Sequence, residues 1–213
     1  RRNENLALLN ELSSTLATSS DIDEILEKAL NQIMDYLQLE VGEFFLMQED
    51  RRSLKRSMHR GEIVNTIWRT DYFKLGEGFV GVTAKDGFPR LLDLPFDDEN
   101  NELDPVIYEK QFRQLALLPL HGRRGILGVL CVGTCHPQPL DELEVQFLAA
   151  ISSWVGTGIE NMQLNLQGRR LAILEERERI GMDLHDGIIQ SIYAVGLTLE
   201  HARLLLNEEP DVA

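Results

Sequence analysis

The sequence is poor in cysteine and contains no long apolar run. Only two of its 213 residues are cysteine, Cys131 and Cys135, which lie four residues apart without a second pair. This spacing favours neither a disulfide framework nor a closed thiolate zinc site. No stretch approaches the roughly 20 consecutive apolar residues that span a bilayer, and no basic-then-apolar leader opens the chain. We therefore expect a soluble, cytoplasmic fragment, while membrane attachment of the full-length protein through other regions stays open.

Basic side chains are also scarce. The chain carries 21 Lys and Arg residues against 35 Asp and Glu residues, a formal net charge of −14. Nucleic acids reward clustered positive charge, so this composition argues against direct nucleic-acid binding. The hydrophobic fraction of 43% is ample for a buried core. Because the chain begins with Arg-Arg and stops directly after a helical pattern, we expect it to be a piece of a longer protein.

Helical and strand patterns follow one another along the first 135 residues. A first helix is indicated by leucines at helical spacing (Leu6, Leu9, Leu12 and Leu16). Asp21, with Glu24 three residues on, is a plausible cap for a second helix that ends near Leu37. Residues 39–135 alternate short apolar runs with Gly, Pro and charged turns, a pattern typical of strands. The clearest hairpin is "LALLPLHGRRGILGVLCVG", in which "HGRRG" supplies the turn glycines.

A long helix is expected after residue 140. Asp141 and Glu144 form a capping-box pattern, and the apolar residues that follow recur at helical spacing to Leu166. No proline occurs from there to Pro210, and Gly168 is the weakest point. The pattern predicts a nearly continuous helix that joins the sheet region to the terminal segment. Since isolated helices are marginal in water, this helix needs a partner, and a second copy of the chain is the simplest one.

The terminal helix carries an apolar seam beside a histidine. The seam follows the 4-3-4-3-4 spacing of a coiled coil or four-helix bundle through Ile188, Ile192, Val195, Leu199, Ala202 and Leu206. At 100° per residue, His185 lies about 60° from Ile188, at the accessible margin of the seam. Asp186 and Gln190 are four residues apart and project together from a more outward face.

The chemistry of this group of side chains fits nucleophilic catalysis. An accessible neutral imidazole is a nucleophile when a neighbouring carboxylate accepts or orients its other proton, and Asp186 stands next to His185. Gln190 could hold a water molecule for the reverse, hydrolytic reaction without adding a repelling charge. On spacing alone, the alternative of an ordinary surface histidine and a solvated aspartate stays open.

The run "ERERIGMDLHDGIIQSIYAVGLTLE" resembles the phosphoacceptor helix of sensor histidine kinases of the NarX/DesK type. The resemblance covers residues 175–206, with Gly181 where the family often has alanine. It implies that His185 is the phosphoacceptor, that Asp186 is the base assisting phosphotransfer, and that Gln190 serves the phosphatase reaction on a response regulator. A homodimer, a separate ATP-binding kinase domain and a response regulator are the implied partners.

The upstream region resembles a GAF domain. The segments that carry this resemblance are "LGEGFVGVTAKDGFPRLLDL", "LLPLHGRRGILGVLCVG" and "LDELEVQFLAAISSWVGTGIENMQL". The implied fold is α+β, a GAF-like antiparallel sheet flanked by helices, with long N- and C-terminal coiled-coil or bundle helices. We expect an N-terminal signalling helix at 1–19, a GAF sensor domain at 20–166, and a connecting helix with the first helix of a dimerisation and phosphotransfer domain at 167–213.

The sequence does not name the ligand of the sensor domain. The stretch "PVIYEKQFRQLALLPL" contains no histidine where haem-sensing relatives carry one, so haem is disfavoured. The pair Cys135-His136 follows the final expected strand, where an attached tetrapyrrole chromophore is not expected. Four aromatic residues are the candidates for lining a small-molecule pocket, although an aromatic residue in a core strand is more often part of the core: Phe44, Trp68, Phe79 and Phe96.

Three functions are weighed on this basis. The first is the sensory and phosphoacceptor part of a two-component histidine kinase, in which the GAF signal controls autophosphorylation of His185. The fragment lacks ATP-binding motifs, so we expect no cofactor in it, ATP and Mg²⁺ on the absent kinase domain, and no activity alone. The second is a non-enzymatic GAF ligand-binding and dimerisation module of a regulatory protein. The third, a cyclic-nucleotide enzyme or binder, has no paired metal carboxylates to support catalysis.

Overall fold

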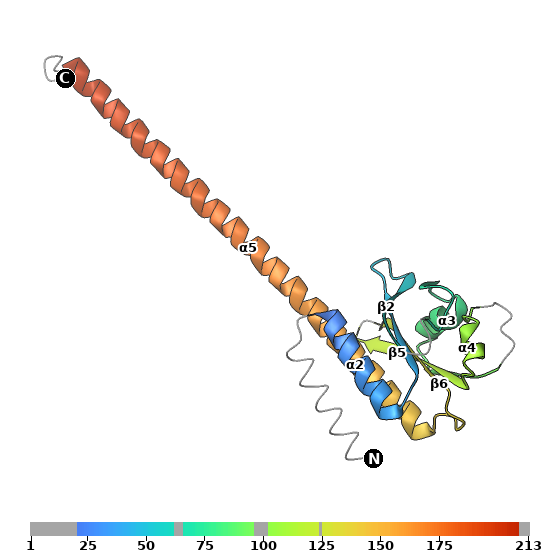
Figure 1. Ribbon diagram of the computed structural model, residues 1–213. Helices are drawn as coiled ribbons and strands as arrows, with labels where there is room; N and C mark the ends of the chain where they lie inside the picture. The colour runs from blue at the N-terminus through green and yellow to red at the C-terminus, as the bar shows by residue number, and fades with distance from the viewer. Residues whose placement is uncertain (1–20, 62–65, 96–101, 124, 209–213) are drawn as a thin grey trace. The chain divides into compact units, whose positions relative to one another are not determined.

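A computed structural model of the protein describes residues 21–61, 66–95, 102–123 and 125–208, with side chains as far as residue 204. The chain divides into two compact units after Gln163. The first unit contains all the strands and the shorter helices, and the second consists of the later part of the last helix (Figure 1). Each unit is described below by itself.

Six antiparallel strands form one sheet in the order β3-β2-β1-β6-β5-β4 (Figure 1). The strands are β1 (Val41–Met47), β2 (Ser53–Gly61), β3 (Tyr72–Lys74), β4 (Arg90–Asp93), β5 (Gln114–Gly122) and β6 (Gly125–Thr134). Strands β1, β5 and β6 are almost wholly buried, which explains their near-continuous apolar sequences. The predicted "HGRRG" hairpin is confirmed as the β5–β6 connection, with Gly125 at φ +124°.

Helices cover both faces of the sheet and create two separate cores. Helix α2 (Ile22–Leu37) and the first part of α5 (Glu142–Glu208) lie side by side on one face (Figure 1). Their core includes Leu26, Leu30 and Phe44 together with Leu148, Ile151 and Val155. The opposite face is covered by α3 (Gly78–Asp86) and α4 (Val106–Glu109), and its core includes Phe45, Ile67, Trp68, Phe73, Val80 and Cys131.

The helix starts follow the predicted capping patterns. The Asp21 side chain accepts a hydrogen bond from the Asp23 N–H at 3.2 Å, and α2 ends at Leu37 as expected. At the start of α5, Asp141 Oδ1 accepts from Glu144 N at 2.8 Å. Glu144 Oε2 accepts in return from Asp141 N at 2.9 Å, which confirms the capping box.

The predicted long helix is confirmed as α5, which runs without a break from Glu142 to Glu208 and includes Gly168. In the described part of the chain, no helix is long and apolar enough to cross a membrane. Some expectations fall outside the described residues. They are the helix at 1–19, Phe96 and the side chain of Leu206.

The centre of the sheet requires glycine at position 128. A Cβ added to Gly128 would lie 2.2 Å from the carbonyl oxygen of Phe45 and 3.1 Å from a methyl group of Leu120. We predict that Gly128→Ala lowers the free energy of unfolding by about 3 kcal/mol, because the backbone of β1 has to shift. Urea denaturation followed by circular dichroism measures the change. Ser153→Ala, on the exposed side of α5, is the control and should change stability by less than about 0.5 kcal/mol; equal effects would contradict the packing argument.

Candidate functional site

His185 is an accessible imidazole on the second unit. Its side chain is 71% exposed, and its Nδ1 lies 3.4 Å from Oδ1 of Asp186, whose side chain is 75% exposed. No hydrogen bond to Nε2 of His185 occurs among the described residues. The Asp186 carboxylate thus lies beside Nδ1 of the ring, while Nε2 faces no described hydrogen-bond partner.

Gln190 extends this group along the same helix. It is exposed and stands four residues after Asp186, so the two side chains leave the helix on adjacent turns of one face. One turn and a half before His185, Arg179 donates two hydrogen bonds to Glu176, at 3.0 Å and 2.6 Å. These hydrogen bonds raise the pKa of the Arg179 guanidinium above its ordinary value. The structure thus places the three predicted residues together on a fully helical, exposed segment.

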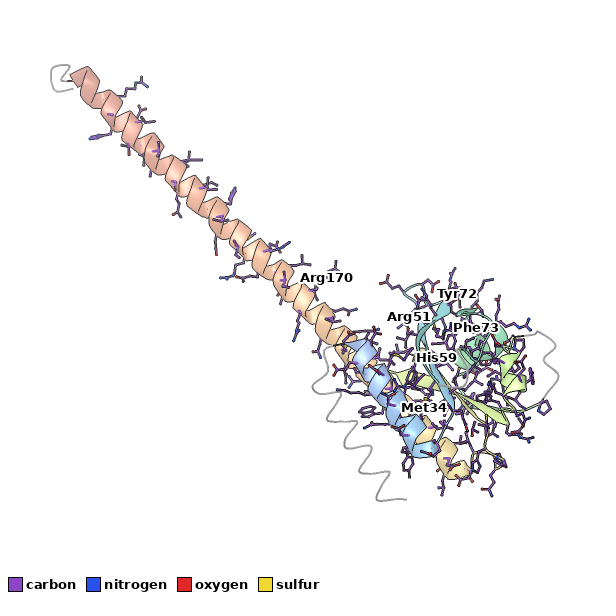
Figure 2. All side chains as sticks on the ribbon, viewed as in Figure 1. Met34, Arg51, His59, Tyr72, Phe73 and Arg170 are labelled. Atoms are coloured by element: carbon purple, nitrogen blue, oxygen red, sulfur yellow. The ribbon has the colours of Figure 1, made fainter. Side chains whose placement is uncertain are left out.

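Apolar side chains surround this group without cover from the described part of the chain. Every described side chain from Gln163 to Leu204 is exposed (Figure 2). They include large hydrophobic residues at Leu164, Leu166, Leu171, Ile173, Leu174, Ile180, Leu184, Ile188, Ile192, Val195 and Leu199. So many exposed apolar groups on one helix are typical of a surface that another molecule covers.

The three described aromatic residues considered for a ligand pocket do not all lie together. Phe44 is fully buried on the α2 and α5 face of the sheet. Trp68 and Phe79 lie on the opposite face, with ring centroids 6.0 Å apart, and Phe73 packs edge-on against Trp68. Of the described candidates, only Trp68 and Phe79 therefore share a site.

A buried carboxylate stands beneath this aromatic pair and was missed from the sequence. Glu43 is 0% exposed in the middle of β1. Its Oε1 accepts from the Ile67 N–H at 3.1 Å and from Nη1 of Arg56 at 3.3 Å, and lies 3.0 Å from Nδ1 of His59. Arg56 also bonds to the Thr66 hydroxyl. Glu43 therefore fixes the segment that carries Trp68. The signal in the sequence was a single charge inside the apolar run "VGEFFLM".

The second carboxylate oxygen of Glu43 has a different environment. Oε2 is buried and has no hydrogen-bond partner among the residues that the structure describes. Across the sheet, Glu43 pairs with Cys131 of β6. Burial raises the pKa of the Cys131 thiol well above its ordinary value, and the charge of Glu43 raises it further, while the Trp68 side chain opposes the shift. A buried acceptor without a partner lowers the stability of the fold unless a water molecule or a ligand donates a hydrogen bond to it.

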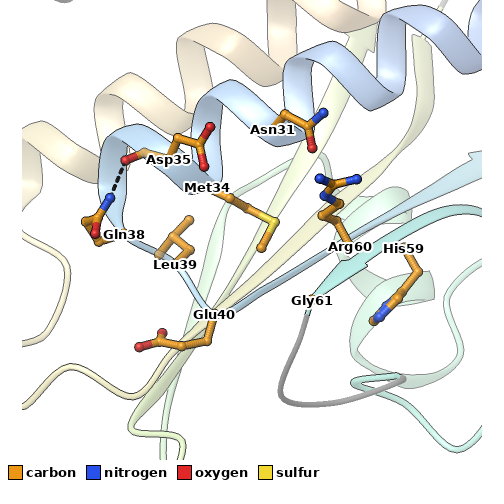
Figure 3. Close-up of a pocket in the computed structure, with 9 residues that line it drawn as sticks. All are labelled: Asn31, Met34, Asp35, Gln38, Leu39, Glu40, His59, Arg60 and Gly61. Carbon is orange, nitrogen blue, oxygen red and sulfur yellow. Dashed lines mark hydrogen bonds between the residues drawn. The ribbon is translucent and has the colours of Figure 1, made fainter.

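An open groove of about 760 Å³ lies on the surface between the end of α2 and the end of β2 (Figure 3). Met34 and Leu39 give it an apolar floor, while Asp35, Glu40 and Arg60 place charges of both signs around it. Within the described residues, no group of three or more His, Cys, Asp or Glu side chains could hold a metal ion. The groove therefore offers mixed polarity without a concentrated binding chemistry.

Two family models match the chain. Residues 19–160 match the GAF domain model, and residues 176–213 match the model described as histidine kinase. The second match contains His185, Asp186 and Gln190.

Curated relatives and a solved structure agree with these matches. The chain is 25% identical to sensor histidine kinase YhcY of Bacillus subtilis (strain 168), across 98% of this chain and 56% of that protein. It is 24% identical to the Nif-specific regulatory protein of Azospirillum brasilense, across 80% of this chain and 28% of that protein. The GAF domain of an Acinetobacter phosphoenolpyruvate-protein phosphotransferase superposes with a TM-score of 0.63 at 20% identity, covering 76% of this chain and 96% of that one. The chain thus spans about half or less of its curated relatives.

Removal of the Glu43 carboxylate should destabilise the sheet unit strongly. Glu43→Ala leaves the Arg56 guanidinium and the Ile67 N–H without their acceptor, so we predict a loss of about 3 kcal/mol in unfolding free energy. Glu43→Gln keeps a carbonyl oxygen at the same place and should lose less. Denaturant unfolding with Trp68 fluorescence, in a Trp154→Phe background, measures both. Glu27→Gln, which changes an exposed carboxylate, is the control; the account is wrong if all three variants unfold at the same denaturant concentration.

The two thiols should differ in reactivity. Cys131 is fully buried, and its pKa is raised well above the ordinary value, whereas Cys135 is partly exposed with a smaller rise. A higher pKa means less thiolate at pH 8, so iodoacetamide should alkylate Cys135 in the folded protein and Cys131 only after denaturation. Peptide mass spectrometry separates the two sites. Comparable alkylation rates at both cysteines of the folded protein would refute this.

Proposed function

The chain belongs to the GAF domain family through residues 19–160, and from this premise we propose that it is the sensory and phosphoacceptor part of a two-component sensor histidine kinase. The match of residues 176–213 to the histidine kinase family supports the proposal. The observation that carries it is the exposed His185 imidazole beside the Asp186 carboxylate inside that matched segment. The kinase domain that binds ATP and Mg²⁺ lies outside these residues in this proposal.

The residues act as follows in the phosphorylation step. Asp186 holds the proton on Nδ1 of His185, so the lone pair of Nε2 is free to attack. Nε2 attacks the γ-phosphorus of ATP, the N–P bond forms, the bond to the leaving oxygen breaks, and ADP departs. The positive charge that develops on the imidazole is stabilised by the Asp186 carboxylate. The phosphoryl group then passes from His185 to a response regulator.

Gln190 serves the opposite reaction. Its amide is neutral and exposed on the face that also carries Asp186. A neutral amide can position a water molecule for attack on a phosphorylated regulator without repelling the phosphoryl group. In this proposal, one face of the helix presents either phosphorylated His185 or the amide of Gln190 to the response regulator.

A second copy of the chain covers the apolar side chains of α5 in this proposal. Seam A consists of the positions that continue the 3-4 spacing of the terminal seam upstream: Leu164, Gln167, Leu171, Leu174, Glu178, Gly181 and His185. Seam B consists of the residues directly preceding four of them: Leu166, Ile173, Ile180 and Leu184. Both seams continue into the terminal apolar seam, which begins at Ile188. One residue corresponds to about 100° of helix rotation, so the two seams face different directions.

The choice between the seams decides whether His185 is accessible. When seam A faces the partner helix, His185 itself lies in the interface, next to the polar Glu178 and the small Gly181. When seam B faces the partner, Ile180 and Leu184 fill the interface and His185 turns to its flank. Seam A leaves Ile180 and Leu184 outside the interface, whereas seam B leaves Leu171 and Leu174 outside it. A signal can shift the balance between two arrangements when their free energies are similar.

The sensor unit supplies that signal in this proposal. Trp68, on the segment that Glu43 holds, and Phe79 lie in its interior, and Oε2 of Glu43 has no hydrogen-bond donor among the described residues. A small molecule that reaches this interior changes the position of the Trp68 segment relative to β1. The proposal includes Trp68 and Phe79 as ligand contacts and leaves Phe44, on the opposite face, as core.

A second candidate function is a non-enzymatic GAF module of a regulatory protein. The similarity to the Nif-specific regulatory protein over 80% of this chain favours it. In that case α5 only dimerises, and His185 is an ordinary exposed side chain. Labelling of His185 separates the two functions.

The phosphoacceptor assignment predicts a specific loss of label. When this chain is mixed with the separately made ATP-binding domain of the same protein and radiolabelled ATP, His185→Gln should reduce acid-labile label to background. Asp186→Asn should slow labelling about 100-fold, because the proton on Nδ1 is no longer controlled. Asp183→Asn, which changes an exposed carboxylate two residues before His185, is the control and should label normally. Full labelling of His185→Gln would rule out the assignment and favour the non-enzymatic module.

A further inference from the structure

Two polar atoms on the α3 side of the sheet are buried without a hydrogen-bond partner among the described residues. One is Oε2 of Glu43, a residue that is 0% exposed, and the other is the indole Nε1 of Trp68, a residue that is 1% exposed. The carboxylate oxygen is an acceptor, whereas the indole N–H is a donor. Each lowers the stability of the fold while it lacks a partner. A single molecule that donates one hydrogen bond and accepts another would satisfy both atoms.

Cys131 shows that these two atoms lie in the same part of the core. Glu43 stands directly opposite Cys131 in the β1–β6 pairing and projects to the same face of the sheet as Phe45, into the core that also contains Trp68. Burial raises the pKa of the Cys131 thiol, the charge of Glu43 raises it further, and a contact with the Trp68 side chain lowers it. Both side chains therefore lie beside the sulfur. A thiol is only a weak acceptor, so it does not satisfy the indole N–H.

The surrounding contacts fix the acceptor and the donor in place. Oε1 of Glu43 accepts from the Ile67 N–H at 3.1 Å and from Nη1 of Arg56 at 3.3 Å, which sets the orientation of the whole carboxylate. The Trp68 ring packs edge-on against Phe73, with ring centroids 5.8 Å apart, which sets the direction of its N–H. A molecule that binds between them therefore finds a preorganised pair of groups.

We propose that Glu43 Oε2 and the Trp68 Nε1–H together bind one small neutral hydrogen-bonding group, which is a buried water molecule in the protein by itself. Buried water molecules typically make about three hydrogen bonds to polar groups that would otherwise be unsatisfied. An anion does not fit, because it has no hydrogen to donate to Oε2 and the Glu43 carboxylate repels it. The inference rests on the proposed function in one respect: a signal molecule that reaches this interior replaces the water with a neutral hydroxyl or amide group.

NMR spectroscopy of the whole chain tests this site. In a Trp154→Phe background, Trp68 supplies the only indole N–H. We expect a nuclear Overhauser cross-peak between this proton and water, with the sign that separates dipolar contact from hydrogen exchange. Glu43→Gln replaces Oε2 by an NH2 donor and should weaken the cross-peak about fivefold, because the charged acceptor is lost. Glu49→Gln removes the same charge from an exposed position after β1 and should leave the cross-peak unchanged.

Mass spectrometry of the same sample after denaturation identifies any small molecule that the folded protein retained. A neutral molecule with a hydroxyl or amide group, found where the cross-peak is missing, supports the site with a ligand as its occupant. The proposal is overturned if neither the cross-peak nor a released molecule is found, or if a retained anion takes the place of the water. An unchanged cross-peak in Glu43→Gln, or an equal loss in Glu49→Gln, also overturns it.

The result is independent of the phosphoacceptor assignment. Labelling of His185 tests the proposed function, and its failure leaves the site between Glu43 and Trp68 untouched. Failure of this site likewise leaves the labelling of His185 intact. If Glu43→Gln does not fold, the cross-peak in the Trp154→Phe protein decides alone.

Discussion

The exposed apolar side chains of α5 are the constraint on which the rest of the structure depends. From Leu164 to Leu204 the helix carries leucine, isoleucine and valine on its surface, and none of these side chains is buried against the described part of the chain. A single helix gains little stability from its own hydrogen bonds in water, so this segment requires tertiary or quaternary packing to persist. In the proposed homodimer, a partner helix supplies this packing. In the same proposal, two seams compete for that partner upstream of Ile188 and give the helix two arrangements.

Two buried carboxylates connect the sheet to its surroundings in complementary ways. Glu43 holds the Trp68 segment over one face of the sheet, and Glu160 holds the β5–β6 turn against α5 on the other. Each accepts a hydrogen bond from a backbone N–H, so each fixes the position of main chain as well as of side chains. Strands β1 and β6, which pair directly, lie between these two points. The two carboxylates are therefore connected through paired strands of one closely packed sheet.

Much of the fold was predictable because it depends on local patterns. The caps at Asp21 and Asp141, the "HGRRG" hairpin and the unbroken final helix all follow from residues close together in sequence. The exposure of His185 followed from helical spacing in the same way. The interior was less predictable, because which aromatic residues share a face depends on strand order. Phe44 and Trp68 lie on opposite faces for that reason, and neither Glu43 nor Glu160 could be identified before their backbone donors were located.

The subunit count of the purified chain tests the central claim most directly. Native mass spectrometry and sedimentation at micromolar concentration should both give twice the 24.3 kDa chain mass, with the second unit helical. The matched comparison is residues 1–163, which lack the exposed seams and should associate more weakly. A stable monomer of the whole chain with α5 intact would show that its apolar side chains need no partner. That result would contradict the dimer, the two seams and the control of His185 together.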